Sequence, residues 1–174
     1  MKLLFTLLFL TVTTITFGQA TKPEPCGMSV VDSPAIRGLK LGMPEADFKK
    51  KLGGNPDPIV TRYDLGKLSG FDNIQSIGWE MFNQRLMRLD VTYDDSVLWN
   101  SGAEFAEALS GPLNLPRASW KYSPPYVADL DCKEFTVSID AKTRRVRLSD
   151  KTAQAAMKED EKAKQADKKK TFKP

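Results

Sequence analysis

Two stretches of this chain alternate apolar and polar residues with a period of two, and no other feature constrains the fold as much. The first spans residues 77–93, with the turn pair Asn83-Gln84 near its middle. The second spans residues 135–148, with a turn at residues 140–142. Each stretch predicts a β-hairpin that buries one of its two faces.

The second strand of the first hairpin predicts which residues share a face. Successive side chains of a strand point to opposite faces, so odd and even positions separate. One face is expected to hold Met87, Leu89, Val91 and Tyr93, and the other Leu86, Arg88, Asp90 and Thr92. The first set is apolar enough to form part of a core.

A helix is predicted before each hairpin. Over residues 44–52, Pro44 suits the first turn, acidic residues precede lysines along the segment, and Gly53-Gly54 supplies the stop. The second helix opens at Ser101, with Glu104 three residues later as a capping box. Its end is expected at Gly111-Pro112.

The order helix, hairpin, helix, hairpin predicts an α+β fold. We expect two helix-plus-hairpin units, about 36–95 and 100–150, to form one domain over residues 36–150. Neither unit can bury its own sheet face, so both should contribute to one small antiparallel sheet with short helices packed on one face. Residues 36–43 are expected as a short strand or extended lead-in, and residues 21–35 as an extended N-terminal segment.

The first 20 residues have the pattern of an export signal. Lys2 is followed by an apolar stretch, and Gly18-Gln19-Ala20 places small residues where signal peptidase cleaves. We therefore expect cleavage near Ala20 and a periplasmic or extracellular protein. Cys26 does not directly follow the apolar stretch, which argues against a lipoprotein, and no later apolar run is long enough to span a membrane.

Cys26 and Cys132 are the two cysteines of the chain. An oxidising compartment makes them the expected disulfide pair, which would close a loop of about 100 residues. The alternative is a pair of free buried thiols. Neither cysteine has a second one three residues away, so a redox-catalytic role is not indicated.

The net charge of +4 belongs to the C-terminal tail. Residues 151–174 contain eight lysines and four acidic residues, whereas the preceding body is close to neutral. With almost no large apolar side chain, the tail is expected to be a frayed helix or disordered. Lys168, Lys169 and Lys170 are candidate contacts for an anionic surface, with an unspecific solvated tail as the alternative.

Little in the chain points to catalysis. There is no histidine, which excludes histidine triads and histidine-ligated zinc, and two cysteines cannot build a four-cysteine metal site. Asp94-Asp95 and the pair Asp129 and Asp131 lack a general-base partner or a calcium-loop spacing. We expect a protein that is not an enzyme and needs neither cofactor nor metal.

Four aromatic residues are candidates for an interaction surface, because tryptophan and tyrosine are frequent interface anchors. They are Trp99, Trp120, Tyr122 and Tyr126, beside Pro124-Pro125, which is expected to hold an extended edge. The alternative is that Trp120 and Tyr122 are core residues at the start of a strand.

The run Gly38-Leu39-Lys40-Leu41-Gly42-Met43-Pro44 and the Leu52-Gly53 step resemble the lead motif of the BamE/SmpA–OmlA and β-lactamase-inhibitor-protein-like superfamily. In that superfamily a Gly-Met step enters a short helix and a hairpin follows, as residues 79–93 do here. The resemblance covers about a fifth of the chain and implies an exported, non-enzymatic protein that binds other proteins. The chain lacks the lipoprotein cysteine of some members and adds the lysine-rich tail.

The expected function is therefore an exported, non-catalytic protein-binding or envelope-associated module whose partner is another exported or envelope protein. The alternative is a surface-binding protein whose basic tail contacts cell-wall polymer, anionic lipid or nucleic acid, with nucleic acid the least favoured. The sequence leaves the oligomeric state open.

Overall fold

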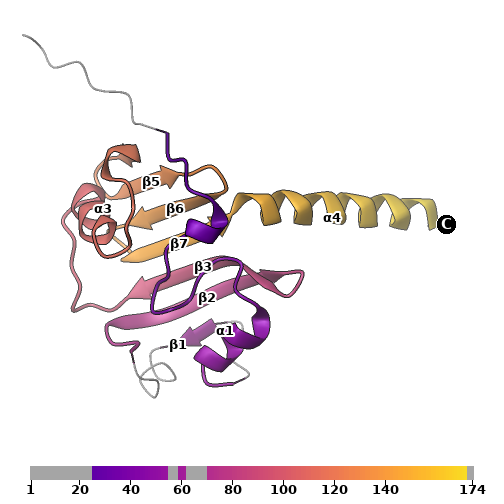
Figure 1. The fold of residues 1–174 in the computed structure, drawn as a ribbon, viewed down its shortest axis with the longest axis horizontal. Coiled ribbons are helices and arrows are strands. Elements are labelled where there is room, and N and C mark those ends of the chain that lie inside the picture. Colours follow the sequence, from indigo (N-terminus) through magenta and orange to yellow (C-terminus); the bar gives the residue numbers. More distant parts are fainter. Residues whose placement is uncertain (1–24, 55–58, 62–69, 172–174) are drawn as a thin grey trace, which may run out of the picture.

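The computed structural model describes residues 25–54, 59–61 and 70–171, so the expected export signal lies outside the described residues. These residues form one seven-stranded antiparallel sheet with the order β1-β2-β3-β7-β6-β5-β4 (Figure 1). The strands are β1 (Ile59–Thr61), β2 (Ile74–Phe82), β3 (Arg85–Tyr93), β4 (Trp120–Ser123), β5 (Val127–Asp131), β6 (Phe135–Asp140) and β7 (Arg145–Asp150). The α-helices are α1 (Glu45–Lys51), α3 (Gly102–Ser110) and α4 (Lys151–Thr171), and the short 3-10 helices are η1 (Val30–Asp32) and η2 (Arg117–Ser119).

The mixed helix-and-sheet class and the antiparallel sheet agree with the sequence prediction. The finer plan, one hairpin for each helix, does not describe the sheet. Three strands follow α1 and four strands follow α3. The extra strands are β1, in a segment with weak patterning, the four-residue β4, and β5, whose buried phase consists of Ala128 and Leu130 alone.

One face of the sheet carries the core. Strand register places apolar residues in rows across the strands, such as Leu89, Leu148, Val137 and Leu130. All four are fully buried, and they share one cluster with Phe48 of α1 and Phe105 of α3. Both helices, α1 and α3, therefore cover the same face of the sheet (Figure 1).

The first hairpin has the predicted turn but not quite the predicted faces. Asn83 and Gln84 both have positive φ, 48° and 60°, as tight hairpin turns require. An irregularity pairs Glu80 with Arg88 and then Met81 with Leu86, which leaves Met87 as an extra residue. Because of this bulge, Leu86 joins the core cluster with Leu89, whereas Met87 is buried outside that cluster. The assignment of Leu86 to the polar face was therefore wrong.

The helix predictions agree with the structure to within about a residue. Pro44 caps α1 rather than forming its first turn, and Gly54 N–H closes its end on Lys49 O at 2.9 Å. The Oγ of Ser101 accepts the Glu104 N–H at 3.1 Å, as a capping box requires. The Glu104 carboxylate instead accepts the N–H of Asn100 at 2.8 Å.

The lead-in at residues 36–43 is a turn rather than a strand. Ile36 and Leu39 exchange both backbone hydrogen bonds at 2.9 Å, while Arg37 and Gly38 between them have positive φ. Gly42 and Met43 then pair with Leu86 at the start of β3. The preceding segment is also not fully extended, since it contains η1.

The lysine-rich tail forms α4, which follows β7 directly and extends away from the sheet (Figure 1). The sequence had left a frayed helix and a disordered tail open; the structure describes one continuous helix. Asp150 caps it by accepting the Ala153 N–H at 2.9 Å. Side chains from Lys158 to Lys170 are all exposed. Among the described residues, no helix combines the length and apolarity that crossing a bilayer needs.

Candidate functional site

The two cysteines form the expected disulfide. Cys26 and Cys132 are joined with their Cα atoms 4.3 Å apart, across 106 residues of chain. Both are buried, at 6% and 2% exposure, and belong to the core cluster. The disulfide is therefore a buried structural crosslink that joins the N-terminal segment to the end of β5.

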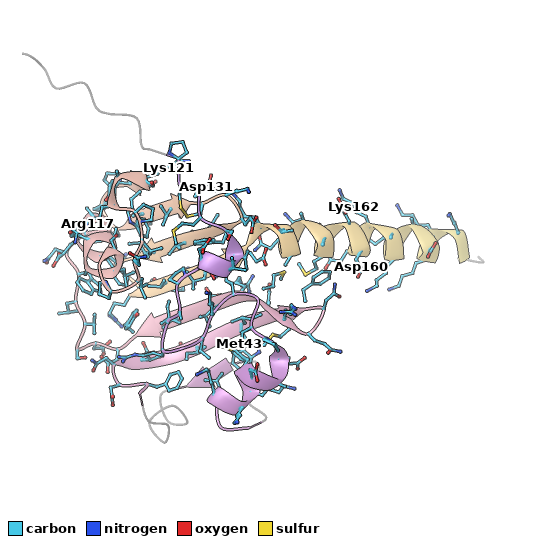
Figure 2. The ribbon with its side chains drawn as sticks, viewed as in Figure 1. Met43, Arg117, Lys121, Asp131, Asp160 and Lys162 are labelled. Carbon is cyan, nitrogen blue, oxygen red and sulfur yellow. A yellow bond between two sulfur atoms is a disulfide. The ribbon has the colours of Figure 1, made fainter. Side chains whose placement is uncertain are left out.

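Polar contacts around the disulfide also fix the start of α4 at Lys151, here called the root of the helix. Lys151 Nζ donates to the Asp131 carboxylate at 2.9 Å and to the Cys132 carbonyl. Asp131 also lies 3.7 Å from Lys121 of β4, and Figure 2 shows these two side chains at the same edge of the sheet. The hydrogen bond from Lys151 lowers the pKa of Asp131 below its ordinary value. The root is thus held by charge-assisted bonds, in contrast to the exposed remainder of α4.

Two of the four aromatic candidates pack inside the protein. Trp120 is 3% exposed, and its Nε1 donates to Ser110 Oγ of α3 at 2.9 Å. Trp99 is half-buried and stacks on Phe105 with ring centroids 4.9 Å apart. Trp120 is therefore a core residue, as the alternative interpretation held, and Trp99 covers the core beside α3.

The other two aromatic candidates are exposed around β4, the strand at one edge of the sheet. Tyr122 is 49% exposed and Tyr126 is 38% exposed. Burial, and secondarily the charge of Glu107, raises the pKa of Tyr122. Pro124 and Pro125, expected to hold an extended edge, instead lie in the turn between β4 and β5.

The turn that presents Tyr126 is seated on the start of α3. The Gly102 N–H donates to Pro125 O at 3.0 Å. A Cβ on Gly102 would lie 2.8 Å from backbone atoms of Tyr126 and Val127, closer than real Cβ contacts. Only glycine allows this approach, so α3 and the β4–β5 turn form one unit.

The lysine candidates Lys168, Lys169 and Lys170 lie in the last turn of α4, all exposed. An i,i+4 ion pair of 2.6 Å between Lys164 and Asp160 stabilises the helix before them. Asp160 and Lys162 mark this middle part of the helix in Figure 2, well away from the sheet. The three lysines are thus carried at a distance from the near-neutral body.

The face of the sheet opposite the core, here called the open face, was not singled out by the sequence. On this face Glu80 of β2, Arg88 and Asp90 of β3 and Arg147 of β7 form a network of ion pairs. Asp90 lies 3.1 Å from Arg88 and 2.7 Å from Arg147, and Arg88 lies 2.7 Å from Glu80. These side chains are held by one another in the middle of the sheet.

The open face is hollowed beside this network. A larger hollow of about 410 Å³ is lined by Ser76, Gly78, Trp79, Glu80, Arg88, Asp90, Thr92, Arg145 and Arg147. A smaller one of about 150 Å³ is lined by Val127, Ser138, Ile139, Asp140, Arg145 and Arg147. The two hollows share Arg145 and Arg147 and therefore adjoin.

The two shared arginines differ in their partners. Arg147 Nε is bound to Asp90, whereas Arg145 is exposed and joins no ion pair of the described residues. The nearest acid in its row, Asp140, accepts the backbone N–H groups of Lys142 and Thr143 at 2.9 and 3.2 Å. Burial acts to raise the pKa of Asp140, but these bonds and the charge of Arg145 leave it lowered.

The carboxylate pairs do not converge on a reaction centre. Asp94 is buried and accepts the Ser96 N–H at 3.0 Å, which makes it a turn-forming residue. Asp129 and Asp131 lie on the open-face phase of β5, and Asp131 pairs with lysines. Within the described parts of the chain, His, Cys, Asp and Glu side chains form no group of three or more suited to a metal ion.

The polar phase of β3 and β7 was the signal that could have pointed to the open face. Arg88, Asp90 and Thr92 were expected to face away from the core, and Arg145 and Arg147 alternate in the same way. What the sequence does not contain is the pairing of β3 with β7, which brings Asp90 opposite Arg147.

Comparison with protein-family models, curated proteins and solved structures gives no match to this chain.

Proposed function

We propose that this chain is an exported, non-catalytic module that binds another exported or envelope protein. The observation that supports it most is the unequal use of the sheet: one face carries the core cluster, and the other is polar and hollowed. At the β4 edge Tyr122 and Tyr126 are also exposed, and the pairing of Tyr122 with Ala128 places Tyr122 on the core-face phase of that strand. Exposed tyrosines next to an unpaired edge strand are common in protein interfaces.

Export is part of the same proposal. A buried disulfide is typical of proteins that mature in an oxidising compartment, and residues 1–20 have the pattern of an export signal. The resemblance of residues 38–53 to the BamE/SmpA–OmlA and β-lactamase-inhibitor-protein-like superfamily supports a binding role. Cleavage near Ala20 and a periplasmic or extracellular location belong to this proposal.

The test is site-specific photocrosslinking in the native envelope. A photoreactive phenylalanine replaces Tyr122 or Tyr126 in the full chain, and Lys50, exposed on α1, serves as the control position. A discrete crosslinked protein from both tyrosine positions, absent at Lys50, is the expected result. Equal crosslinking at all three positions, or none at either tyrosine, would rule the edge out as a binding surface.

A second candidate function is favoured by the shape of α4. Its continuous helix holds Lys168, Lys169 and Lys170 away from the body, where they can reach an anionic polymer or lipid surface. Vesicle co-sedimentation with phosphatidylglycerol should then require residues 151–174 and weaken with rising salt. Recovery of the same partner protein with and without those residues would place the function in the folded domain instead.

A further inference from the structure

The most specific chemical feature of the open face is the pair Arg145 and Arg147, two residues apart on β7. Both line both hollows, and strand geometry directs their side chains to the same face. We infer that this pair binds a carboxylate from an acidic segment of the partner protein, an inference that rests on the proposed protein-binding function.

Arg147 is already ordered for such a role. Its Nε donates to Asp90, and Asp90 is in turn held by Arg88. The terminal nitrogens of its guanidinium carry further N–H donors in a planar fork that matches a carboxylate. Because the protein fixes this side chain before binding, less conformational entropy of Arg147 is lost when a ligand binds.

Arg145 supplies the charge that the network does not neutralise. Over both hollows the basic and acidic side chains balance, because Asp140 lies opposite Arg145 in the smaller one. In the larger hollow alone, Arg88, Arg145 and Arg147 are basic, whereas Glu80 and Asp90 are acidic, which leaves a local charge of +1. One carboxylate would balance this charge. Ser76, Thr92 and Ser138 add hydroxyl groups around the same two arginines.

The rest of the open face argues for an acidic protein segment over a polyanion. Asp129, Asp140 and Glu80 are spread across it, so a nucleic acid or a lipid headgroup array would meet repeated repulsion. A protein loop can place one carboxylate at the arginines and neutral residues elsewhere. The exposed side chain of Val127, which lines the smaller hollow, suits such a mixed segment.

The test is a titration of the isotope-labelled protein followed by nuclear magnetic resonance. The probes are the end-capped peptide Gly-Glu-Gly-Glu-Gly, its glutamine counterpart, and inorganic phosphate. We expect the glutamate peptide to shift the Nε resonances of Arg145 and Arg147 and the Ser138 amide, and the glutamine peptide to leave them unchanged. Arg145→Gln should weaken this binding roughly two- to fivefold. Arg117→Gln, an identical change at an exposed arginine beside α3 (Figure 2), should not weaken it.

Three results would overturn the inference. They are no shift on the open face, equal shifts with the glutamine peptide, and phosphate binding at least as tightly as the glutamate peptide. An equal loss in Arg117→Gln would show that net charge alone attracts the peptide and would also contradict it. If crosslinking at Tyr122 and Tyr126 still captures a partner, the proposed function stands while this inference fails.

Discussion

The two faces of the sheet use the same strands for opposite purposes. On β7, Val146 and Leu148 are fully buried in the core, while Arg145 and Arg147 between and beside them line the open face. A shift of one residue in register would exchange these sets. The difference teaches that stability and the candidate binding surface are built from alternate residues, so each can be changed with the other nearly intact.

The largest effect is expected on the core side, at the disulfide. Cys132→Ser removes a crosslink that closes 106 residues, which is worth about 4–5 kcal/mol in the chain-entropy model. Urea unfolding of the oxidised protein and of the variant measures it. A loss below about 1 kcal/mol would mean that the native contacts around Met28 and Glu134 hold the segment without the bond.

The next largest effect compares the two faces directly. Leu148→Ala empties a fully buried site between Leu89 and Val137 and should destabilise the protein by about 2–5 kcal/mol. Thr136→Ala, on the open-face phase of β6, should change stability by less than about 0.5 kcal/mol. Similar losses from both changes would contradict the division between the faces.

The ion-pair network of the open face should contribute less. In a double-mutant cycle, Asp90→Ala and Arg147→Ala should show a coupling energy of about 0.2–1 kcal/mol, because the Arg147 side chain is 40% exposed. Thermal unfolding of the four proteins gives the coupling. A coupling energy of several kcal/mol would mean that this network mainly stabilises the fold and is not chiefly part of a binding surface.

The contribution of Asp131, at the root of α4, to the free energy of unfolding should decrease at acidic pH. The bond from Lys151 lowers the pKa of Asp131 from its ordinary 3.8, so this carboxylate stabilises the fold above that pH. The contribution is lost as the pH falls through the lowered pKa, since the proton then binds more tightly to the unfolded chain. Asp131→Asn should therefore be less stable than the native protein at pH 6 and should approach it near pH 2. A constant difference over that range would exclude the titration of Asp131 as its cause.

The smallest effect is expected from the distal part of α4. Truncation after Met157 removes Lys158 to Lys170, whose side chains are exposed, so the free energy of unfolding should change by less than about 0.5 kcal/mol. Circular dichroism should lose helical signal at the same time. A clear loss of stability would show that the distal helix packs on the body.

The sequence predicted the elements whose signals are local. The turn Asn83-Gln84, the Ser101 cap of α3 and the alternation in β6 and β7 each involve neighbouring residues, and all are present in the structure. It failed where the signal was weak or came from another element. The bulge at Met87 arises from pairing with β2, and β4 and β5 are short strands whose place in the sheet is given by their pairing with each other and with β6.

The candidate site divides in the same way. The sequence singled out the aromatic residues, but it could not separate the buried Trp120 from the exposed Tyr122. Burial depends on α3, whose Ser110 accepts the Trp120 N–H, and no local pattern specifies that contact.

The sequence by itself determined the antiparallel character of the sheet and the apolar phase of most strands, because these follow from the side-chain period. It left a disulfide and two free thiols as alternatives for Cys26 and Cys132, and the tertiary structure joins them. Tertiary structure decided that β3 lies beside β7, and therefore that Asp90 binds Arg147 while Arg145 joins no ion pair of the described residues. These residues are more than fifty positions apart, so their contact exists only once the sheet has assembled. The open face is a property of that assembly.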